Sequence, residues 1–171
     1  MNKELFPYNS ILTVCSVNTA RSPMVEAYLR EIFNSLGLKI HVNSCGVASN
    51  ARDNMLVSLD AKLVLKEDGI EPKESKSLDL KKHKEILKNY DLILTLTEKH
   101  KQQVLDLNGE FNGEIFTLKE FAGKKGDIKD PSMKGIKGFR KARDEIKECI
   151  FDGLNRWFPN LTFNKIKTKI K

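Results

Sequence analysis

A cysteine that stands six positions before an arginine, inside a short polar loop, constrains this chain more than any other feature. The loop reads Cys15-Ser16-Val17-Asn18-Thr19-Ala20-Arg21-Ser22. The apolar, β-branched run at residues 11–14 predicts a buried strand before the loop. Ser22-Pro23 predicts a helix start after it, because Ser can cap a helix and Pro is tolerated in the first turn. Cys15 is therefore expected where a strand ends, and Arg21 where a helix begins.

A strand-loop-helix turn of this kind is suited to binding an oxyanion. Its backbone N–H groups converge on one concavity at the positive end of a helix dipole. The planar guanidinium of Arg21 can clamp two oxygens of a tetrahedral anion. The same surroundings favour the thiolate form of a cysteine, the form that acts as a nucleophile. A nucleophile inside a phosphate cradle indicates phosphoryl transfer through Cys15.

The rest of the chain alternates between strand-like and helix-like periodicity. Strands are predicted over residues 11–14, 39–44, 90–96 and 114–118. Helices are predicted over residues 22–36, 55–65, 80–87, 98–107 and 139–157. This alternation predicts an α/β fold: an open four-stranded parallel sheet with helices on both faces, which binds ligands beyond the carboxyl ends of its strands. We expect residues 1–158 to form a single catalytic α/β domain. Residues 159–171, whose end alternates like a strand without a visible partner, are interpreted as a basic tail.

Composition excludes several other classes of protein. Three scattered cysteines in 171 residues match neither a disulfide framework nor a zinc site. No apolar run is long enough to span a membrane, and residues 1–7 lack the apolar core of a signal peptide. The net charge of +7 comes without any nucleic-acid-binding signature. We therefore expect a cytoplasmic protein with no cofactor, no metal, no nucleic acid partner and no membrane partner. Cys45, Cys149 and the three histidines are assigned no chemical role.

The motifs together resemble those of the low-molecular-weight protein-tyrosine-phosphatase family. The resemblance runs in order from about Ile11 to Trp157 and rests on these stretches: Val14 to Met24, Ser44-Cys45-Gly46, Asp91 to Leu94, Phe116 to Gly123, and Asp130-Pro131. It implies a flavodoxin-like fold and a metal-independent hydrolysis of phosphotyrosine-type phosphomonoesters. The expected partners are therefore a phosphorylated protein or peptide substrate, and inorganic phosphate or a similar oxyanion in the loop.

The resemblance also implies roles for particular residues. Cys15 would become phosphocysteine, Arg21 would clamp the phosphoryl oxygens, and Asp130 would act as general acid and then as general base. Ser22 would donate a hydrogen bond to the sulfur, and Asn18 would brace the loop. The phosphate-binding residues would be Ser16, Val17, Asn18, Thr19, Ala20, Arg21 and Ser22.

Four positions depart from the family pattern. Val17 replaces the usual glycine and predicts an ordinary backbone conformation there. Ala20 stands where many members carry a second cysteine. Ser132 follows Asp130-Pro131 where phosphotyrosine-selective members place an aromatic residue, and only Phe121 or Phe139 would then offer a ring. Thr19 replaces a bulky aliphatic residue, as in the protein-arginine-phosphatase branch.

Three alternatives to a phosphotyrosine phosphatase follow from these residues. The first is a protein-arginine-phosphatase, because Thr19 leaves room for a planar guanidinium. The second is a thioredoxin-linked arsenate reductase, which needs further cysteines after the third strand, whereas residues 95–107 contain none. The third is a non-catalytic phosphate-binding module, which would keep Arg21 without needing Asp130.

Overall fold

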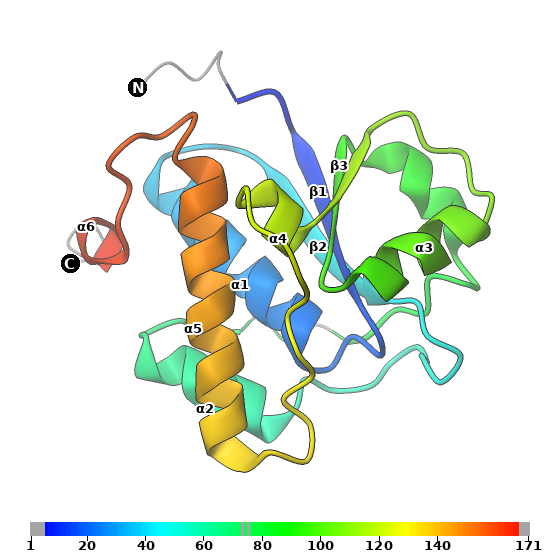
Figure 1. Ribbon diagram of the computed structural model, residues 1–171, viewed down its shortest axis with the longest axis horizontal. Coiled ribbons are helices and arrows are strands. Elements are labelled where there is room, and N and C mark those ends of the chain that lie inside the picture. Colours follow the sequence, from blue (N-terminus) through cyan, green and yellow to red (C-terminus); the bar gives the residue numbers. More distant parts are fainter. Residues whose placement is uncertain (1–5, 73, 75, 168–171) are drawn as a thin grey trace.

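The computed structural model describes residues 6–72, 74 and 76–167, and a four-stranded parallel sheet forms its centre (Figure 1). The strands are β1 (Ser10–Cys15), β2 (His41–Gly46), β3 (Leu92–Thr95) and β4 (Glu114–Thr117). Their order is β2-β1-β3-β4, and every neighbouring pair is parallel. The chain passes from β1 to one neighbour and later to the other, so the end of β1 is the switch point where such sheets bind ligands. The predicted sheet is confirmed.

Helices cover both faces of this sheet. They are α1 (Arg21–Ser35), α2 (Leu59–Glu67), α3 (Glu98–Asp106), α4 (Leu118–Phe121), α5 (Gly135–Leu154), α6 (Phe163–Lys167) and the 3-10 helix η2 (Lys84–Asn89). Successive residues of β1 point to opposite faces, so Ile11 joins one apolar cluster with α1 and α5, while Leu12 joins another with η2 and α3. In Figure 1, α1 and α5 lie on one side of the strands and α3 on the other.

The predicted helix at residues 55–65 begins later than its apolar pattern indicates. Leu56 is extended and forms an antiparallel bridge with Lys76. The helix α2 begins after Ser58, whose side chain caps it by accepting a hydrogen bond from the N–H of Ala61. The cap, rather than the apolar spacing, therefore sets the start of α2.

Two other predicted helices differ in detail from the structure. The predicted helix at 80–87 is the 3-10 helix η2, and α5 begins at Gly135 rather than at residue 139. The short helix α4 was not predicted. It follows β4 directly because Thr117 and Glu120 form a capping box, in which each side chain accepts a hydrogen bond from the other residue's backbone N–H.

The packed part of the chain extends beyond the predicted boundary at residue 158. The alternation at residues 165–171 is typical of a strand, but residues 163–167 form α6, in which Ile166 is 2% exposed. The ring of Phe163 lies 6.0 Å from that of Tyr28 and 6.3 Å from that of Phe151. These contacts seat α6 on α1 and α5. Residues 168–171 of the predicted tail lie outside the described residues.

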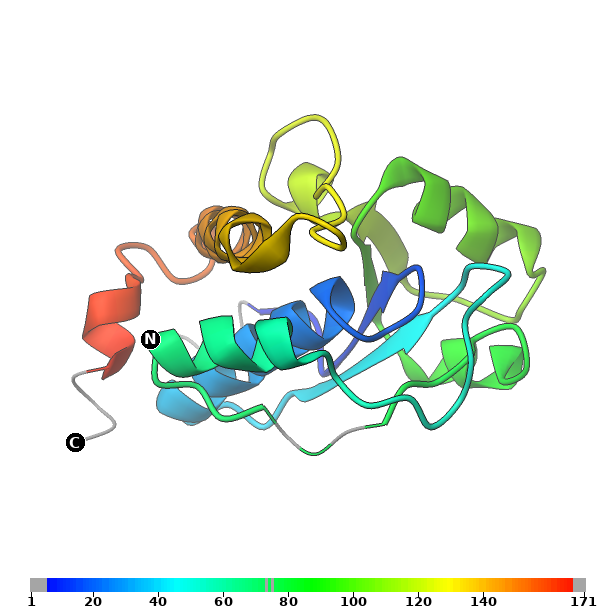
Figure 2. The same ribbon diagram turned by 90° about the horizontal axis from the view of Figure 1, so that it is seen from below.

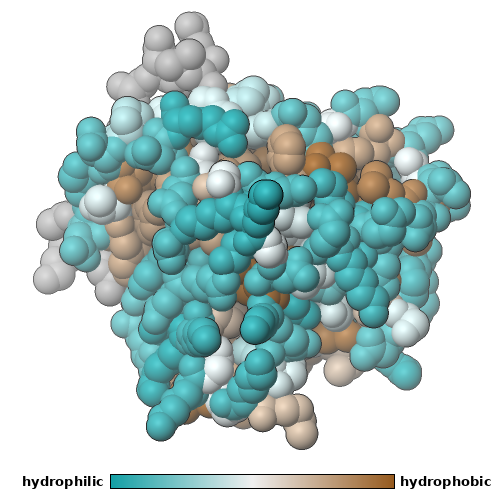
Figure 3. Space-filling model, viewed as in Figure 1, coloured by the Kyte–Doolittle hydropathy of each residue, from teal (hydrophilic) through white to brown (hydrophobic). Residues whose placement is uncertain are grey.

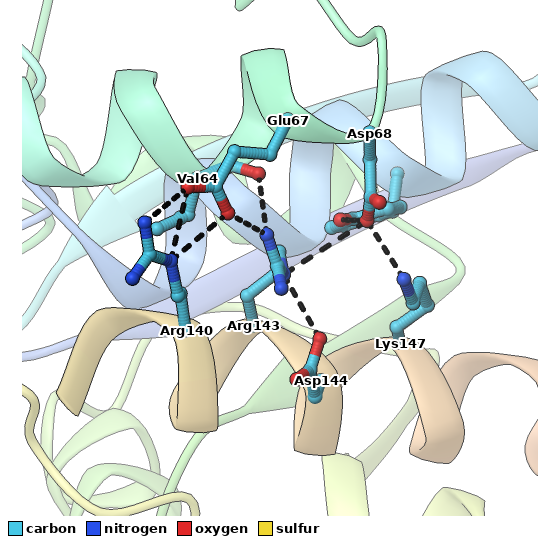
Figure 4. Close-up of polar contacts among 8 residues, drawn as sticks. Val64, Glu67, Asp68, Arg140, Arg143, Asp144 and Lys147 are labelled. Atoms are coloured by element: carbon cyan, nitrogen blue, oxygen red, sulfur yellow. Dashed lines mark hydrogen bonds and ion pairs between the residues drawn. The ribbon is translucent and has the colours of Figure 1, made fainter. Parts of the chain in front are cut away.

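A cluster of ion pairs joins α2 to α5 (Figure 4). The Nη1 atom of Arg143 donates to the backbone carbonyl oxygen of Val64 at 3.1 Å and to the carboxylate of Glu67. One turn further along α5, the Nζ atom of Lys147 lies 2.8 Å from a carboxylate oxygen of Asp68. The cluster therefore anchors the helix that follows the long loop at residues 122–134.

We expect Arg143→Met to lower the free energy of unfolding by about 1–2 kcal/mol, because the Val64 carbonyl loses its donor and the carboxylates of Glu67, Asp68 and Asp144 lose a cation. The measurement is urea denaturation followed by circular dichroism. Arg140→Met is the matched control, since Arg140 contacts the same Glu67 carboxylate from a half-exposed position. We expect that variant to lose much less, because an ion pair at an exposed position is screened by water. Equal losses would show that the buried position of Arg143 contributes nothing.

Candidate active site

The loop between β1 and α1 turns around the sulfur atom of Cys15. The backbone N–H of Asn18 donates to this sulfur at 3.3 Å, and the hydroxyl oxygen of Ser22 lies 3.0 Å from it. Cys15 is only 3% exposed. Asn18 has φ 61°, in the left-handed region that asparagine tolerates. Val17 is not among the described residues with positive φ, as predicted.

Neighbouring backbone N–H groups hold the loop from its outer side. The N–H of Val47 lies 3.0 Å from the carbonyl oxygens of both Cys15 and Ser16. The N–H of Ser58 donates to the carbonyl oxygen of Thr19 at 2.8 Å. With these carbonyl oxygens engaged outside, the N–H groups of the loop are left to face its concave side. The loop therefore has the polarity of an anion cradle.

Gly46, at the end of β2, allows the loop to pass this closely. A Cβ atom at this position would lie 2.8 Å from the carbonyl oxygen of Ser16 and 2.9 Å from the carbonyl carbon of Val17. Both are backbone atoms, which cannot move away without distorting the loop. The absence of a side chain at Gly46 is therefore a requirement of the site.

A buried chain of hydrogen bonds runs from a carboxylate to the sulfur. The Ser44 hydroxyl donates to the carboxylate of Glu26, which is 5% exposed. The amide nitrogen of Asn18 lies 2.8 Å from the Ser44 oxygen and 2.9 Å from the Ser22 oxygen, and donates to both. The amide oxygen of Asn18 accepts from the backbone N–H of Leu78 at 3.0 Å, which fixes the orientation of the amide.

The direction of this chain follows from the donors and acceptors at its two ends. A carboxylate can only accept, so Ser44 must give its proton to Glu26 and accept from Asn18. Ser22 also accepts from Asn18, so its own proton is free for the sulfur of Cys15, 3.0 Å away, or for the carbonyl oxygen of Cys45, 3.3 Å away. Glu26 is thus connected, through Ser44, Asn18 and Ser22, to the hydroxyl group that can donate to the sulfur.

The guanidinium of Arg21 lies beside the sulfur loop and is itself 5% exposed. Its Nη1 donates to the carbonyl oxygen of Ile128 at 2.9 Å. Its Nη2 donates to the Ser16 hydroxyl at 3.1 Å and to a carboxylate oxygen of Asp130 at 3.3 Å. The long loop at residues 122–134 is therefore tied to Arg21 at two points. These contacts bring together the three residues that the sequence predicts as catalytic.

The carboxyl group of Asp130 is ionised in this arrangement. Partial burial raises its pKa, but the hydrogen bonds from Ser132 and the charge of Arg21 outweigh burial and lower the pKa below its usual value. Half of the Asp130 side chain is exposed. A carboxylate here can take a proton from water, and it can deliver one only after its proton affinity has risen.

His100 belongs to the site, although the sequence analysis assigned it no role. It lies near the start of α3, is 3% exposed, and its Nε2 atom is 2.8 Å from the Ser16 hydroxyl oxygen. Burial and the charge of Arg21 lower its pKa to about 4, so the ring is neutral at pH 7. The one feature of the sequence that could have pointed to His100 is its position just after β3, which is a neighbour of β1 in the sheet.

The walls beside the loop contain no exposed aromatic ring. Phe121 and Phe139 are 2% and 6% exposed and lie within the main apolar cluster, and the Phe121 ring stacks on Trp157. Residues 47–55 and 129–134 include no aromatic residue. Thr19 remains partly exposed in the loop. A substrate ring therefore finds no stacking partner on these walls.

The remaining cysteines lie away from this chemistry. Cys45 belongs to the apolar cluster on the opposite face of the sheet from Cys15, is fully buried, and burial raises its thiol pKa well above the usual value. Cys149 lies in the core on α5, and burial raises its pKa as well. All three cysteines are free thiols in this structure.

The described part of the chain offers no candidate metal site, because no group of three or more His, Cys, Asp or Glu side chains in it is arranged to hold a metal ion. None of its helices has the length and apolar character needed to cross a membrane.

Comparison with known proteins places this geometry in a family. The family model described as "Low molecular weight phosphotyrosine protein phosphatase" matches residues 10–162. A "Protein-arginine-phosphatase" of Geobacillus stearothermophilus is 39% identical over 145 residues, which cover 84% of this chain and 92% of the relative. The "Low molecular weight protein-tyrosine-phosphatase PtpB" of Staphylococcus haemolyticus (strain JCSC1435) is 34% identical over 137 residues, 80% of this chain and 91% of the relative.

A solved structure extends the likeness to the backbone. It is described as a YwlE arginine phosphatase, a mutant with a phosphorylated active-site serine. It is 32% identical to this chain, has a TM-score of 0.79, and the match covers 90% of this chain and 99% of that one.

We expect Glu26→Gln to slow alkylation of Cys15 by iodoacetamide at pH 7 about fivefold, the equivalent of one hydrogen bond of about 1 kcal/mol. Arg30, 2.7 Å from Glu26, can only donate. The new amide would therefore turn its oxygen to Arg30 and its NH₂ group to Ser44, which breaks the direction of the chain. Mass spectrometry of the alkylated peptide gives the rate.

Ser44→Ala is the matched control, because it interrupts the same series of hydrogen bonds but keeps the charge of Glu26. We expect it to slow alkylation similarly, and the double variant to be no slower than either single one. Faster alkylation of Glu26→Gln would contradict this interpretation, since it would mean that Glu26 acts only as a negative charge near the sulfur.

Proposed function

The chain belongs to the low molecular weight phosphotyrosine protein phosphatase family, and on this premise we propose that it dephosphorylates protein side chains through a phosphocysteine at Cys15, with phosphoarginine as its preferred substrate. Members of this family are hydrolases, and the chain is an enzyme of that class. The observation that carries the proposal is that one loop at the end of β1 directs the Ser22 hydroxyl and the Asn18 N–H at the Cys15 sulfur and ends at the buried Arg21 guanidinium, which contacts the Asp130 carboxylate.

In the first step, the sulfur of Cys15 forms a bond to phosphorus as the bond to the leaving group breaks. The inward N–H groups of residues 16–22 and the guanidinium of Arg21 hold the three equatorial oxygens, where negative charge is concentrated. Asp130 gives its proton to the departing atom. The products are phosphocysteine and the free side chain.

Asp130 must be protonated for this step. The bound phosphoryl group would favour the protonated form of its carboxyl group. Its carboxylate shares Nη2 of Arg21. A phosphoryl dianion in the loop would draw that N–H to itself and place negative charge beside the carboxylate. Both changes raise the proton affinity of Asp130.

In the second step, a water oxygen attacks phosphorus and the sulfur–phosphorus bond breaks. Asp130, now a carboxylate, takes the proton of that water. Ser22 donates a hydrogen bond to the sulfur as it leaves as a thiolate. Inorganic phosphate is released, and no metal takes part in either step. Because Cys15 must stay reduced, we place the enzyme in the cytoplasm.

Phosphoarginine is favoured by the walls of the site. A phosphotyrosine ring gains affinity from aromatic neighbours, which the exposed walls do not offer. Thr19, small and polar, leaves room for a planar guanidinium and offers a hydroxyl group at the loop. The relative from Geobacillus stearothermophilus, named a protein-arginine-phosphatase, supports the same choice.

Phosphotyrosine is the second candidate substrate. The relative PtpB, named a protein-tyrosine-phosphatase, is 34% identical to this chain. The chemistry at Cys15 is the same for both substrates, since only the atom that leaves phosphorus differs.

We expect the purified protein to hydrolyse para-nitrophenyl phosphate, measured by absorbance of nitrophenolate. Cys15→Ser should remove this turnover, and Asp130→Asn should lower kcat by about 10²- to 10³-fold, the usual contribution of a general acid. Asp127→Asn is the control, because this nearby carboxylate accepts a hydrogen bond from the backbone N–H of Glu98 and is given no catalytic role. No turnover by the unaltered protein would exclude the enzymatic proposal.

We expect Thr19→Ile to reverse the substrate preference. Matched peptides carrying either phosphoarginine or phosphotyrosine are compared by phosphate release, and the ratio of kcat/KM values is the readout. The unaltered protein should favour phosphoarginine. In the variant, the ratio of kcat/KM for phosphoarginine to that for phosphotyrosine should be at least about tenfold lower, because an aliphatic side chain fills the space of the guanidinium. Val17→Ile is the control, since it enlarges another loop residue. An unchanged ratio would show that Thr19 does not set the substrate preference.

A further inference from the structure

Large apolar side chains that remain exposed are concentrated in two segments next to the loop. Six large apolar side chains are strongly exposed in the described part of the chain, and five of them lie at residues 55–63 or at residue 133. We call these five the apolar rim: Met55, Leu56, Leu59, Leu63 and Met133, which are 48%, 68%, 77%, 53% and 102% exposed. The sixth, Leu105, lies on α3.

The first segment of the apolar rim is attached directly to the active-site loop. Ser58, between Leu56 and Leu59, donates its N–H to the carbonyl oxygen of Thr19 at 2.8 Å. On α2, Leu59 and Leu63 are one turn apart and exposed, while the opposite face of the helix is buried in the core. This segment of the rim is therefore hydrogen-bonded, through Ser58, to the residue that we assign to substrate choice.

The second segment approaches the loop from the other side. Met133 follows Asp130 by three residues, and the Asp130 carboxylate contacts Arg21. Met133 has φ 67°, a conformation that costs free energy for a residue with a side chain, and its side chain is fully exposed. In Figure 2, the loop after β1 lies between α2 with its preceding segment and the long loop before α5.

Folding alone does not explain these side chains. The rest of the visible surface over α5 is largely hydrophilic (Figure 3), and the chain carries a net charge of +7. An apolar patch on such a surface is typical of a binding site. Because Ser58 contacts the active-site loop and Met133 lies three residues after Asp130, the rim adjoins the surface that a bound polypeptide substrate would cover.

We propose, on the basis of the function proposed above, that the apolar rim binds apolar side chains flanking the phosphorylated residue. The substrate class is therefore phosphorylated polypeptide segments with large apolar residues within a few positions of the phosphorylated one. In a folded protein such side chains are mostly buried. The enzyme accordingly selects flexible or unfolded segments over phosphorylated residues on polar, folded surfaces.

The test compares two phosphoarginine peptides of equal length and charge, one with leucine and phenylalanine flanking the phosphorylated residue and one with serine and glutamine there. The unaltered protein should show a kcat/KM at least about tenfold higher for the apolar peptide, about 1.4 kcal/mol of differential binding. The triple variant Leu56→Gln/Leu59→Gln/Met133→Gln should lose most of this preference. Leu105→Gln, the matched control, should keep it. Circular dichroism checks that each variant is folded.

Phenyl phosphate is too small to reach the rim. Its hydrolysis therefore tests the phosphatase activity separately from the binding of apolar side chains at the rim. Turnover of phenyl phosphate without any flank preference would overturn the rim proposal and leave the phosphatase intact, whereas no turnover would remove the proposed function itself. Sedimentation velocity provides a further check. A dimer that dissociates in the triple variant would show that the rim joins two copies of this chain, and would overturn its assignment to substrate.

Discussion

The site depends on a loop whose carbonyl oxygens are occupied from outside. Buried backbone N–H and carbonyl groups must find partners, and an irregular loop has to find many of them in neighbouring elements. Here the N–H groups of Val47 and Ser58 take the carbonyl oxygens of Ser16 and Thr19. The N–H groups of the loop are thereby left for a single concave side, where a thiolate and an oxyanion can use them. The rest of the fold serves to bring those outer donors to this place.

This requirement explains residues that have no chemistry of their own. Gly46 ends β2 without a side chain because the backbone at Ser16 and Val17 occupies the space where a Cβ would lie. Ser58 both caps α2 and supplies its N–H to Thr19. The loop is therefore fixed by β2 on one side and by the start of α2 on the other. A change in either element would act on the anion site through the backbone.

The sequence predicted the sheet and the reactive pair because both rest on local patterns. Apolar runs mark the four strands, and the spacing between Cys15 and Arg21 is a property of one loop. His100 could not be predicted, because its role depends on β3 lying beside β1 and on the Ser16 hydroxyl facing α3. The apolar spacing at residues 55–65 also misplaced a helix start, since Leu56 is held extended by Lys76 on a distant strand-like segment.

The contact between Arg21 and Asp130 joins two halves of the chemistry that are 109 positions apart in the sequence. The same Nη2 atom serves the Ser16 hydroxyl and the carboxylate of Asp130, and a phosphoryl oxygen would compete for it. In the proposed mechanism, substrate binding therefore changes the environment of Asp130 when a proton donor is needed. Without substrate, the hydrogen bonds from Ser132 and the charge of Arg21 keep the pKa of Asp130 low, and that ionised form is the one to which we assign the base role of the second step. Acid and base behaviour in one residue then follows from which group holds Arg21.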